Sequence, residues 1–416
     1  MKMMTKLLNS KKYKTIDIII FAVALVLANI VMMRLFYRQA CYTGHGWESD
    51  IVSYIEEITG RNTRYSYPYP LLFWVAKAVL LFTSPEWAIV ISTTFYNVLA
   101  MIATKYVMKK QTGTALLSTF GTLSLFFLSM IYSNGFASFG IPYKYRGVYS
   151  PNPWHNATYM AARPFMIIAF VYCAITLATY EKDFEKGNKL SKEQLTNYII
   201  FAVSLLLATM AKPSYTLVHM GAVGLVMVYR FFKNKCKTFR QTLIMGLFYV
   251  PTIIDMLYQY TSEFTGTSGL GEEQGIGIAL FKVWGYYVDN IPLALVLGTA
   301  FPLLVLLLHF RDLREDGQLR LSWQIYLMGF VMAVIFYEKG SSMYHGNFMW
   351  GYICGLCLVF FTSIILLLKD TKEFMLGEKL GKQVAILSIQ WILLAIHTLM
   401  GLKYFYYLMA FGMDYF

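Results

Sequence analysis

Residues 350–368 read WGYICGLCLVFFTSIILLL, without one charged side chain. About 20 residues of α-helix cross the hydrocarbon core of a bilayer, so a run of this length and apolarity predicts a membrane-spanning helix. Ten further stretches of the chain are comparable. Together they predict eleven spans, at residues 16–36, 86–107, 112–132, 164–180, 195–211, 214–232, 241–261, 291–310, 322–337, 350–368 and 383–402.

The composition of the whole chain agrees with this prediction. Of its 416 residues, 57% are hydrophobic and 14% charged, with a mean hydropathy of +0.50. Because a soluble domain carries about 25% charged residues, this chain has too little polar surface to cover itself in water. A cytosolic enzyme, a disordered regulator and a disulfide-stapled secreted domain are excluded. We expect an all-α polytopic membrane protein, a single membrane-embedded domain over residues 1–416 without a separate soluble domain.

The positive charges predict the orientation of the chain. With the N-terminus in the cytoplasm, the inner segments hold 24 of the 36 lysines and arginines, as the positive-inside rule requires. This asymmetry accounts for much of the net charge of +13, so no nucleic-acid partner is expected. We expect a multi-pass protein of the plasma (inner) membrane, anchored by an uncleaved first span. The short, lysine-rich inner loops favour a bacterial source.

Residues 68–82 form a shorter apolar stretch that contains Lys77. A full span here would invert every later segment and place most of the cationic clusters outside. We therefore predict an interfacial or half-inserted helix at this point.

The first predicted outer segment, residues 37–85, contains the sequence GHGWESDIVSYIEEITG (44–60). Its apolar residues recur at helical spacing and predict an amphipathic helix in the membrane interface. They are Trp47, Ile51, Tyr54, Ile55 and Ile58. Glu48 and Asp50 stand near the start of this helix, where the helix dipole by itself favours carboxylates. A purely structural role and a catalytic role are both open for these two acids.

A second outer helix is predicted from YPYPLLFWVAKAVLLF (67–82). The order of features is a first span, an acid on an outer juxtamembrane helix, a Tyr-Pro-rich second juxtamembrane helix and a span ending in basic residues. This order resembles the GT-C superfamily, the integral-membrane glycosyltransferases that use polyprenyl-phosphate-linked sugars. The resemblance covers residues 15–110 by motif and the rest by topology. The family often has an adjacent acidic pair, whereas Ser49 separates Glu48 from Asp50 here.

The resemblance implies a GT-C-like fold with two outer juxtamembrane helices and a hexosyl or pentosyl transferase. Its donor would be a polyprenyl-phosphate-linked sugar, and its acceptor a glycan, a lipid or a cell-wall polymer on the outer face. Inverting transfer needs a base for the acceptor hydroxyl, and we assign Asp50, with Glu48 beside it. The oligosaccharyltransferase branch has a Trp-Trp-Asp-Tyr-Gly motif that is missing here, which argues against protein N-glycosylation.

The departing carrier phosphate needs fixed cations, and the fork of an arginine matches phosphate oxygens. Arg146 and Arg163 lie in the second outer segment, residues 141–165. Lys212 interrupts an apolar stretch in MAKPSYTLVHM (210–220). We predict that these three side chains bind the donor phosphate. Lys212 could instead extend to the phosphates of ordinary lipids.

Other polar residues of the outer segments are candidates for substrate binding. Aromatic faces can stack on sugars while carboxylates and amides bind hydroxyls, and FYEKGSSMYHGNFMWGY (336–352) combines these groups. An interfacial aromatic belt would explain the aromatic residues equally well. The predicted substrate-binding residues are His155, Tyr215, Glu338, Lys339, His345 and Asn347.

No metal and no cofactor are predicted; the expected partners are the lipid-linked donor, its acceptor and the bilayer. Two other functions are open. An O-antigen or capsule-type polysaccharide polymerase or ligase would also use outer arginines and histidines, but typically through a large loop late in the chain. A flippase or transporter of lipid-linked sugars would place ionisable residues near the bilayer midplane, where this chain has few.

Overall fold

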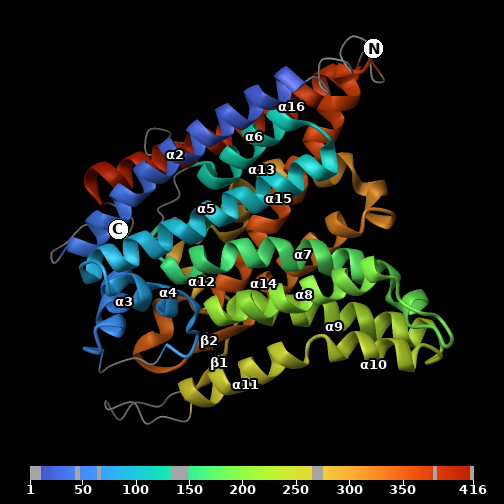
Figure 1. Ribbon diagram of the computed structural model, residues 1–416, viewed down its shortest axis with the longest axis horizontal. Helices are drawn as coiled ribbons and strands as arrows, with labels where there is room; N and C mark the ends of the chain where they lie inside the picture. The colour runs from blue at the N-terminus through green and yellow to red at the C-terminus, as the bar shows by residue number, and fades with distance from the viewer. Residues whose placement is uncertain are drawn as a thin grey trace.

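The computed structural model of the protein describes residues 11–42, 47–62, 67–132, 149–264, 275–377 and 382–412. They form an all-α polytopic membrane protein with one small antiparallel sheet (Figure 1). In chain order the elements are α2 (Lys11–Cys41), α3 (Ile51–Ile58), α4 (Leu71–Leu80), α5 (Pro85–Thr112), α6 (Ala115–Phe127), α7 (Ala157–Asp183), α8 (Lys192–Ala211), α9 (Ser214–Lys233), α10 (Phe239–Leu247), α11 (Val250–Phe264), β1 (Ile276–Ile278), α12 (Trp284–Tyr287), α13 (Ile291–Leu308), η3 (Phe310–Arg314), α14 (Gly317–Ile335), β2 (Phe336–Glu338), η4 (Gly340–His345), α15 (Met349–Met375) and α16 (Lys382–Phe411).

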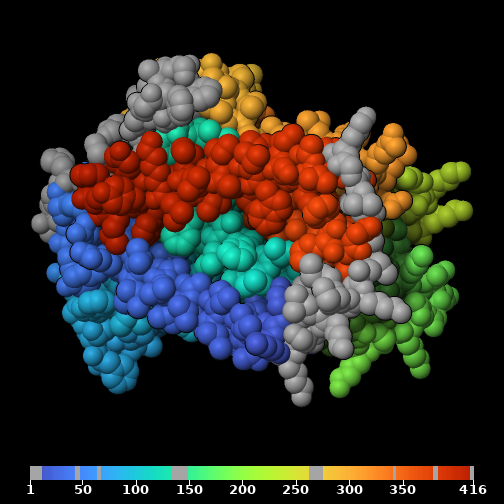
Figure 2. All heavy atoms as spheres, turned by 90° about the horizontal axis from the view of Figure 1, so that it is seen from above, coloured from blue at the N-terminus to red at the C-terminus, as the bar shows by residue number. Residues whose placement is uncertain are grey.

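Within these residues, nine helices are long and apolar enough to cross a membrane. The most apolar window of α15 is entirely buried, whereas only 17% of that of α2 and 22% of that of α16 is buried. A helix that is apolar on all sides belongs in the interior, which places α15 at the centre of the bundle. Figure 2 shows α2 and α16 on one face, flanking α6.

Two of the eleven predicted spans differ from a single long helix. The stretch 112–132 forms α6, of 13 residues, and then continues as extended chain from Leu128. The backbone N–H of Ser129 donates to His397 O (3.2 Å), and that of Ile131 donates to Leu297 O (3.0 Å). Non-helical backbone is tolerated at this depth because neighbouring helices satisfy its polar groups.

The stretch 241–261 is divided between α10 and α11, which are bent by 56° at their junction and together make a tenth candidate span. Nine or ten spans among the described residues therefore replace the predicted eleven. Apolar composition continues across both breaks, so hydropathy alone does not reveal them, although Pro251 at the start of α11 marks the second break.

The two predicted juxtamembrane helices are present as α3 and α4. The buried residues of α3 are Ile51, Tyr54, Ile55 and Ile58, which are the predicted apolar face without Trp47. Helix α4 has 10 residues, far short of a span, and its Lys77 is exposed. The prediction of an interfacial rather than a spanning helix at residues 68–82 therefore agrees with its length.

The segments at the two ends of the bundle differ in their residue composition. Helices α3 and α4 lie at one end of the long axis, and the β1–β2 sheet lies between that end and the middle (Figure 1). Helix α10 and the lysine-rich connection between α7 and α8 lie at the other end. The segments predicted to be inner and those predicted to be outer are thus separated along the helix axes.

Candidate active site

Asp50 lies at the N-cap position of α3, yet its side chain makes no capping hydrogen bond. Its Oδ2 instead accepts a hydrogen bond from Asn156 Nδ2. Ser49 Oγ accepts from the backbone N–H of Ile51 (3.1 Å) and donates to the carbonyl of His155 (2.7 Å). Asp50 is half-buried and therefore points to the start of α7 rather than into bulk solvent.

Asn156 connects α3 to the start of α7. It caps α7, because its Oδ1 accepts from the backbone N–H of Tyr159 (2.8 Å). Its Nδ2 also donates to Tyr54 Oη (3.1 Å), and Tyr54 Oη lies 3.3 Å from Thr158 Oγ1. A side chain that caps a helix has a fixed position, so Asn156 holds the Asp50 carboxylate at a fixed place.

Lys212 approaches the same cluster from the junction of α8 and α9. Pro213 follows it, and Lys212 itself has extended backbone, so the helix ends there and the side chain turns inward. Its Nζ lies 3.4 Å from Thr158 Oγ1 and 4.1 Å from the centre of the Trp350 ring. Burial lowers the pKa of Lys212 to about 8. The negative charge of Asp50 raises this pKa, but by less than burial lowers it.

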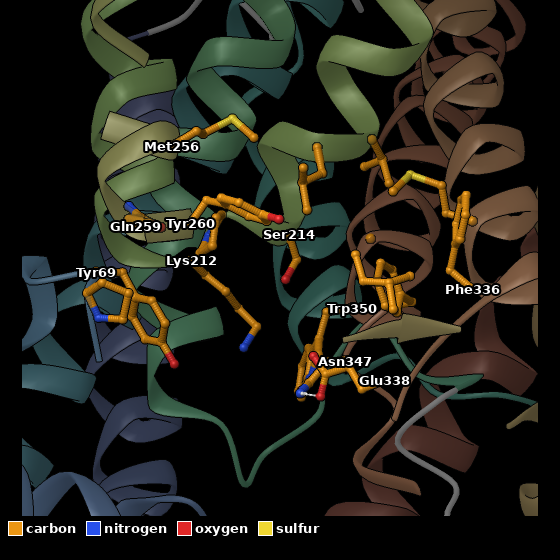
Figure 3. A pocket seen from close by; sticks show the side chains of 18 residues that line it. Tyr69, Lys212, Ser214, Met256, Gln259, Tyr260, Phe336, Glu338, Asn347 and Trp350 are labelled. Carbon is orange, nitrogen blue, oxygen red and sulfur yellow. Dashed lines mark hydrogen bonds between the residues drawn. The ribbon is translucent and has the colours of Figure 1, made fainter. Parts of the chain in front are cut away.

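A cavity of about 480 Å³ opens beside Lys212. Figure 3 shows the Lys212 side chain reaching into it, with Trp350, Asn347 and Glu338 across from it. One wall is apolar and is formed by side chains of α9, α11 and α14. The lining residues are Pro68, Tyr69, Lys212, Pro213, Ser214, Leu217, Val218, Met256, Gln259, Tyr260, Ile276, Met332, Phe336, Glu338, Asn347, Phe348, Trp350 and Gly351.

The β1–β2 sheet positions Glu338 in this lining. Ile276 pairs with Glu338 in the antiparallel register, and the backbone N–H of Lys339 donates to Gly275 O (2.8 Å). Asn347 Nδ2 donates to Glu338 Oε2 (2.7 Å). Burial raises the pKa of the Glu338 carboxyl, while the Asn347 hydrogen bond and the charge of His345 lower it. Among the described residues, the lining of the cavity thus holds one cationic and one acidic side chain.

Not all predicted site residues reach this cavity. Tyr215 is buried on α9 and pairs with His219 Nδ1 (2.9 Å) instead. His155 is also buried, with its ring 5.5 Å from that of Trp350. Lys339 is half-buried, outside the lining. Glu48 and His345 are exposed. Arg146 lies outside the described residues.

Arg163 differs most from its predicted position. We predicted it just before a span that starts at residue 164, but α7 starts at Ala157, so Arg163 lies well inside the helix. Its guanidinium donates to Asn152 Oδ1 (2.6 Å) and to Asn97 Oδ1, and it lies 4.4 Å from the centre of the Phe126 ring. These neutral amides and this ring enclose the cation away from the cavity.

Several residues that the fold brings to the site were not predicted from the sequence. Asn156 and Thr158 belong to an Asn-Ala-Thr sequence, a glycosylation pattern, and both are buried. Gln259 and Tyr69 line the cavity from α11 and from the chain before α4. Nothing in their local sequence marks them, because their role depends on segments far away in the chain. Among the described residues, no group of three His, Cys, Asp or Glu side chains is placed to hold a metal ion.

Comparison with known proteins gives a likeness in structure but none in sequence. No protein-family model matches the chain. No curated protein matches it either. The fold is similar to the crystal structure of ArnT from Cupriavidus metallidurans bound to undecaprenyl phosphate, at 11% sequence identity and a TM-score of 0.46. That alignment covers 94% of this chain and 77% of ArnT.

Proposed function

We propose that this protein is a GT-C-like membrane glycosyltransferase. It moves a sugar from a polyprenyl-phosphate-linked donor to a glycan, lipid or cell-wall acceptor on the outer face of the membrane. One observation carries the proposal: a fixed carboxylate and a buried lysine, from segments far apart in the chain, approach the start of α7 at Asn156 and Thr158, and the lysine lines a cavity with an apolar wall.

Asp50 is the general base in this proposal. As the acceptor hydroxyl attacks the anomeric carbon, its proton passes to the Asp50 carboxylate, and the bond between that carbon and the carrier phosphate oxygen breaks. The attack comes from the face opposite the phosphate and inverts the anomeric configuration. The hydrogen bond from Asn156 keeps the carboxylate oriented without a conformational search at each turnover.

Lys212 binds the carrier phosphate in this proposal. Among the described residues, Lys212 is the only lysine or arginine in the cavity lining, and its ammonium lies against the face of Trp350. A cation in a desolvated site stabilises the negative charge that develops on the leaving phosphate. Leu217, Met256 and Met332 give the prenyl chain an apolar wall beside that phosphate.

The proposal revises the role predicted for Arg163. The enclosed guanidinium of Arg163 holds α5, α7 and the turn at Asn152 together instead of binding phosphate. Glu338 and Asn347 keep their predicted substrate-binding role. His155 contributes through its contact with the Trp350 ring. In this proposal the lysine-rich end of the bundle faces the cytoplasm.

The test is transfer of radiolabelled sugar from undecaprenyl-phosphate-linked donors by the purified protein in liposomes. We expect Asp50→Asn to lower transfer at least 100-fold while the protein still folds and inserts, because loss of a general base typically costs 10²–10⁴-fold. Glu56→Gln, on the exposed face of the same helix, is the matched control and should retain transfer.

Near-wild-type turnover of Asp50→Asn would remove Asp50 from the mechanism. Movement of the lipid between leaflets without a glycosidic product would contradict the transferase and favour a flippase. A product that is a lengthened or ligated polysaccharide would favour the polymerase or ligase.

A further inference from the structure

The turn between α9 and α10 carries positive charge that no nearby acid in the sequence balances. Residues 194–254 contain no aspartate or glutamate. Five cations lie in or beside the turn: Arg230, Lys233, Lys235, Lys237 and Arg240. The three lysines of this group, called the turn lysines below, fall within residues 233–237. The turn therefore concentrates positive charge in a very short piece of chain.

The two arginines are engaged by the rest of the bundle. Arg230 Nη2 pairs with Glu181 Oε2 (2.6 Å). Arg240 Nη1 donates to the carbonyl of Phe184 (2.8 Å). Both contacts fasten the turn to the end of α7. The turn lysines are exposed, and within the part of the chain that the structure describes none of them forms an ion pair or a side-chain hydrogen bond.

The backbone of the turn is held in an unusual conformation. Lys235 and Cys236 have φ angles of 52° and 62°, in the left-handed region that residues with a Cβ seldom adopt. Their N–H groups donate to Phe232 O (2.9 Å) and to Phe231 O (3.0 Å). A strained conformation persists only where its surroundings fix it. The turn lysines thus extend from a fixed backbone and not from a freely moving loop.

An apolar stripe leads away from the turn along α10. Phe239, Leu243 and Leu247 are four residues apart, on one face of the helix, and are 64%, 55% and 57% exposed. Helix α10 belongs to the bent candidate span, so this stripe contacts acyl chains and the turn lies at the depth of the lipid headgroups. Cations and an apolar stripe therefore meet at the boundary between headgroup and hydrocarbon.

We infer that the turn between α9 and α10 binds an anionic phospholipid. The turn lysines bind its headgroup, and the stripe from Phe239 to Leu247 contacts its acyl chains. Charge complementarity favours an anionic lipid over a zwitterionic one. The stripe favours a lipid over a free phosphate or an acidic soluble protein, which bring no acyl chain. The turn and Lys212 lie at opposite ends of α9, so this site is separate from the cavity and does not depend on the proposed transferase activity.

The test reads lipid occupancy beside the turn. A fluorophore is attached to Cys236 of the purified full-length protein carrying Cys41→Ser, in liposomes; the other three cysteines are buried and stay unlabelled. Nitroxide-labelled phosphatidylglycerol and phosphatidylcholine quench the fluorophore when they occupy the site. We expect a relative binding constant at least about fivefold larger for phosphatidylglycerol, because each lysine near an anionic lipid strengthens its binding several-fold.

Two combined variants test the turn lysines directly. Changing Lys233→Gln, Lys235→Gln and Lys237→Gln together should reduce the ratio of binding constants to about twofold or less. Changing the same three residues to arginine keeps the charge and should keep the ratio. Circular dichroism of both variants should match that of the unsubstituted protein, since the three side chains are exposed.

A matched control removes the same charge from the neighbouring connection between α7 and α8. Lys186→Gln, Lys189→Gln and Lys192→Gln also take away three exposed lysines, but there Glu185 and Glu193 are exposed beside them. We expect this combined variant to keep the ratio of the unsubstituted protein within about twofold, because its lysines are partly balanced by acids.

Four outcomes would overturn the inference. The first is equal quenching by the two lipids, and the second is a ratio that survives in the glutamine variant of the turn. The third is an equal loss in the control variant, which would indicate the general charge of this end of the bundle instead of a site. The fourth is displacement of phosphatidylglycerol by excess inorganic phosphate, which would make a free anion the occupant.

Discussion

At the scale of single residues, Lys212 and Arg163 look alike in the sequence and behave differently in the fold. Both are cations at or near the predicted end of a span. Lys212 follows the last turn of α8 and reaches the cavity, whereas Arg163 is enclosed by Asn97, Asn152 and aromatic rings. The role of a charged side chain near the membrane surface therefore depends on the residues around it and not on its residue type.

The pKa of Lys212, lowered by burial to about 8, predicts a pH dependence of donor binding. A base with a pKa of about 8 is about nine-tenths protonated at about pH 7 and about one-tenth protonated at about pH 9. The donor phosphodiester keeps one negative charge over this range, so its affinity should fall several-fold as pH rises through about 8. Titrating donor Kd against pH measures this.

Lys212→Arg is the control for that titration, because arginine stays charged over the whole range. Its donor affinity should not depend on pH between about 7 and about 9. A wild-type affinity that is equally flat would contradict the assignment of the phosphate to Lys212.

Asn156 has a capping role and a positioning role, which one substitution can separate. Asn156→Ser keeps a side-chain acceptor at the N-cap of α7 but loses the amide that reaches Asp50. The cap should survive, since serine caps helices nearly as well as asparagine. The lost hydrogen bonds to Asp50 and Tyr54 should lower the free energy of unfolding by about 1–3 kcal/mol. We also expect kcat to fall at least tenfold with little change in donor KM.

Thermal unfolding and steady-state kinetics on the same preparations check this prediction. Asn156→Ala should lose the cap as well and be less stable than Asn156→Ser. Full activity of the serine variant would show that Asp50 needs no support from α7.

At the scale of elements, the early end of α6 depends on one glycine of a neighbouring helix. His397 Nδ1 donates to Ser129 O (2.7 Å), so α16 carries the polar groups that satisfy the extended chain after α6. A Cβ added to Gly401 would lie 1.4 Å from the carbonyl oxygen of Phe127. The close approach of α16 to the end of α6 therefore requires glycine at position 401.

Gly401→Ala should destabilise the protein by about 1–3 kcal/mol or more, because the overlap is with backbone and forces the two helices apart. The melting temperature in detergent measures the effect. Gly224→Ala, on α9 with nothing within 4 Å of the added Cβ, should leave the melting temperature unchanged or raise it slightly. Equal melting temperatures for the two variants would contradict the packing of α6 on α16.

At the scale of the whole molecule, two exposed cysteines lie at opposite ends and report the orientation. Cys41 ends α2 beside α3, and Cys236 lies in the turn between α9 and α10 (Figure 1). In intact cells, a membrane-impermeant maleimide should label Cys41 and should label Cys236 only after permeabilisation. The other three cysteines are buried and should react only after denaturation.

Cys41→Ser and Cys236→Ser assign the labelling to each position in that experiment. Labelling of Cys236 but not Cys41 in intact cells would reverse the orientation and place the candidate site in the cytoplasm.

The sequence by itself determined the class of the protein and its local helices. Apolar length, charge and helical periodicity act within a few turns, so the membrane spans, the buried face of α3 and the short α4 could be predicted. The break after Phe127 could not, because the groups that satisfy its backbone, such as His397, come from other helices; Pro251 does mark the start of α11.

Only the tertiary structure decided which residues meet. Each step along a helix turns a side chain by about 100°, so packing against neighbours settles whether a polar group faces a cavity, another helix or lipid. Packing turned Tyr215 and Arg163 into the bundle and brought Asn156, Thr158 and Gln259 to Asp50 or to the cavity. The residues of this site lie on segments far apart in the chain, and no local pattern encodes their distance in space.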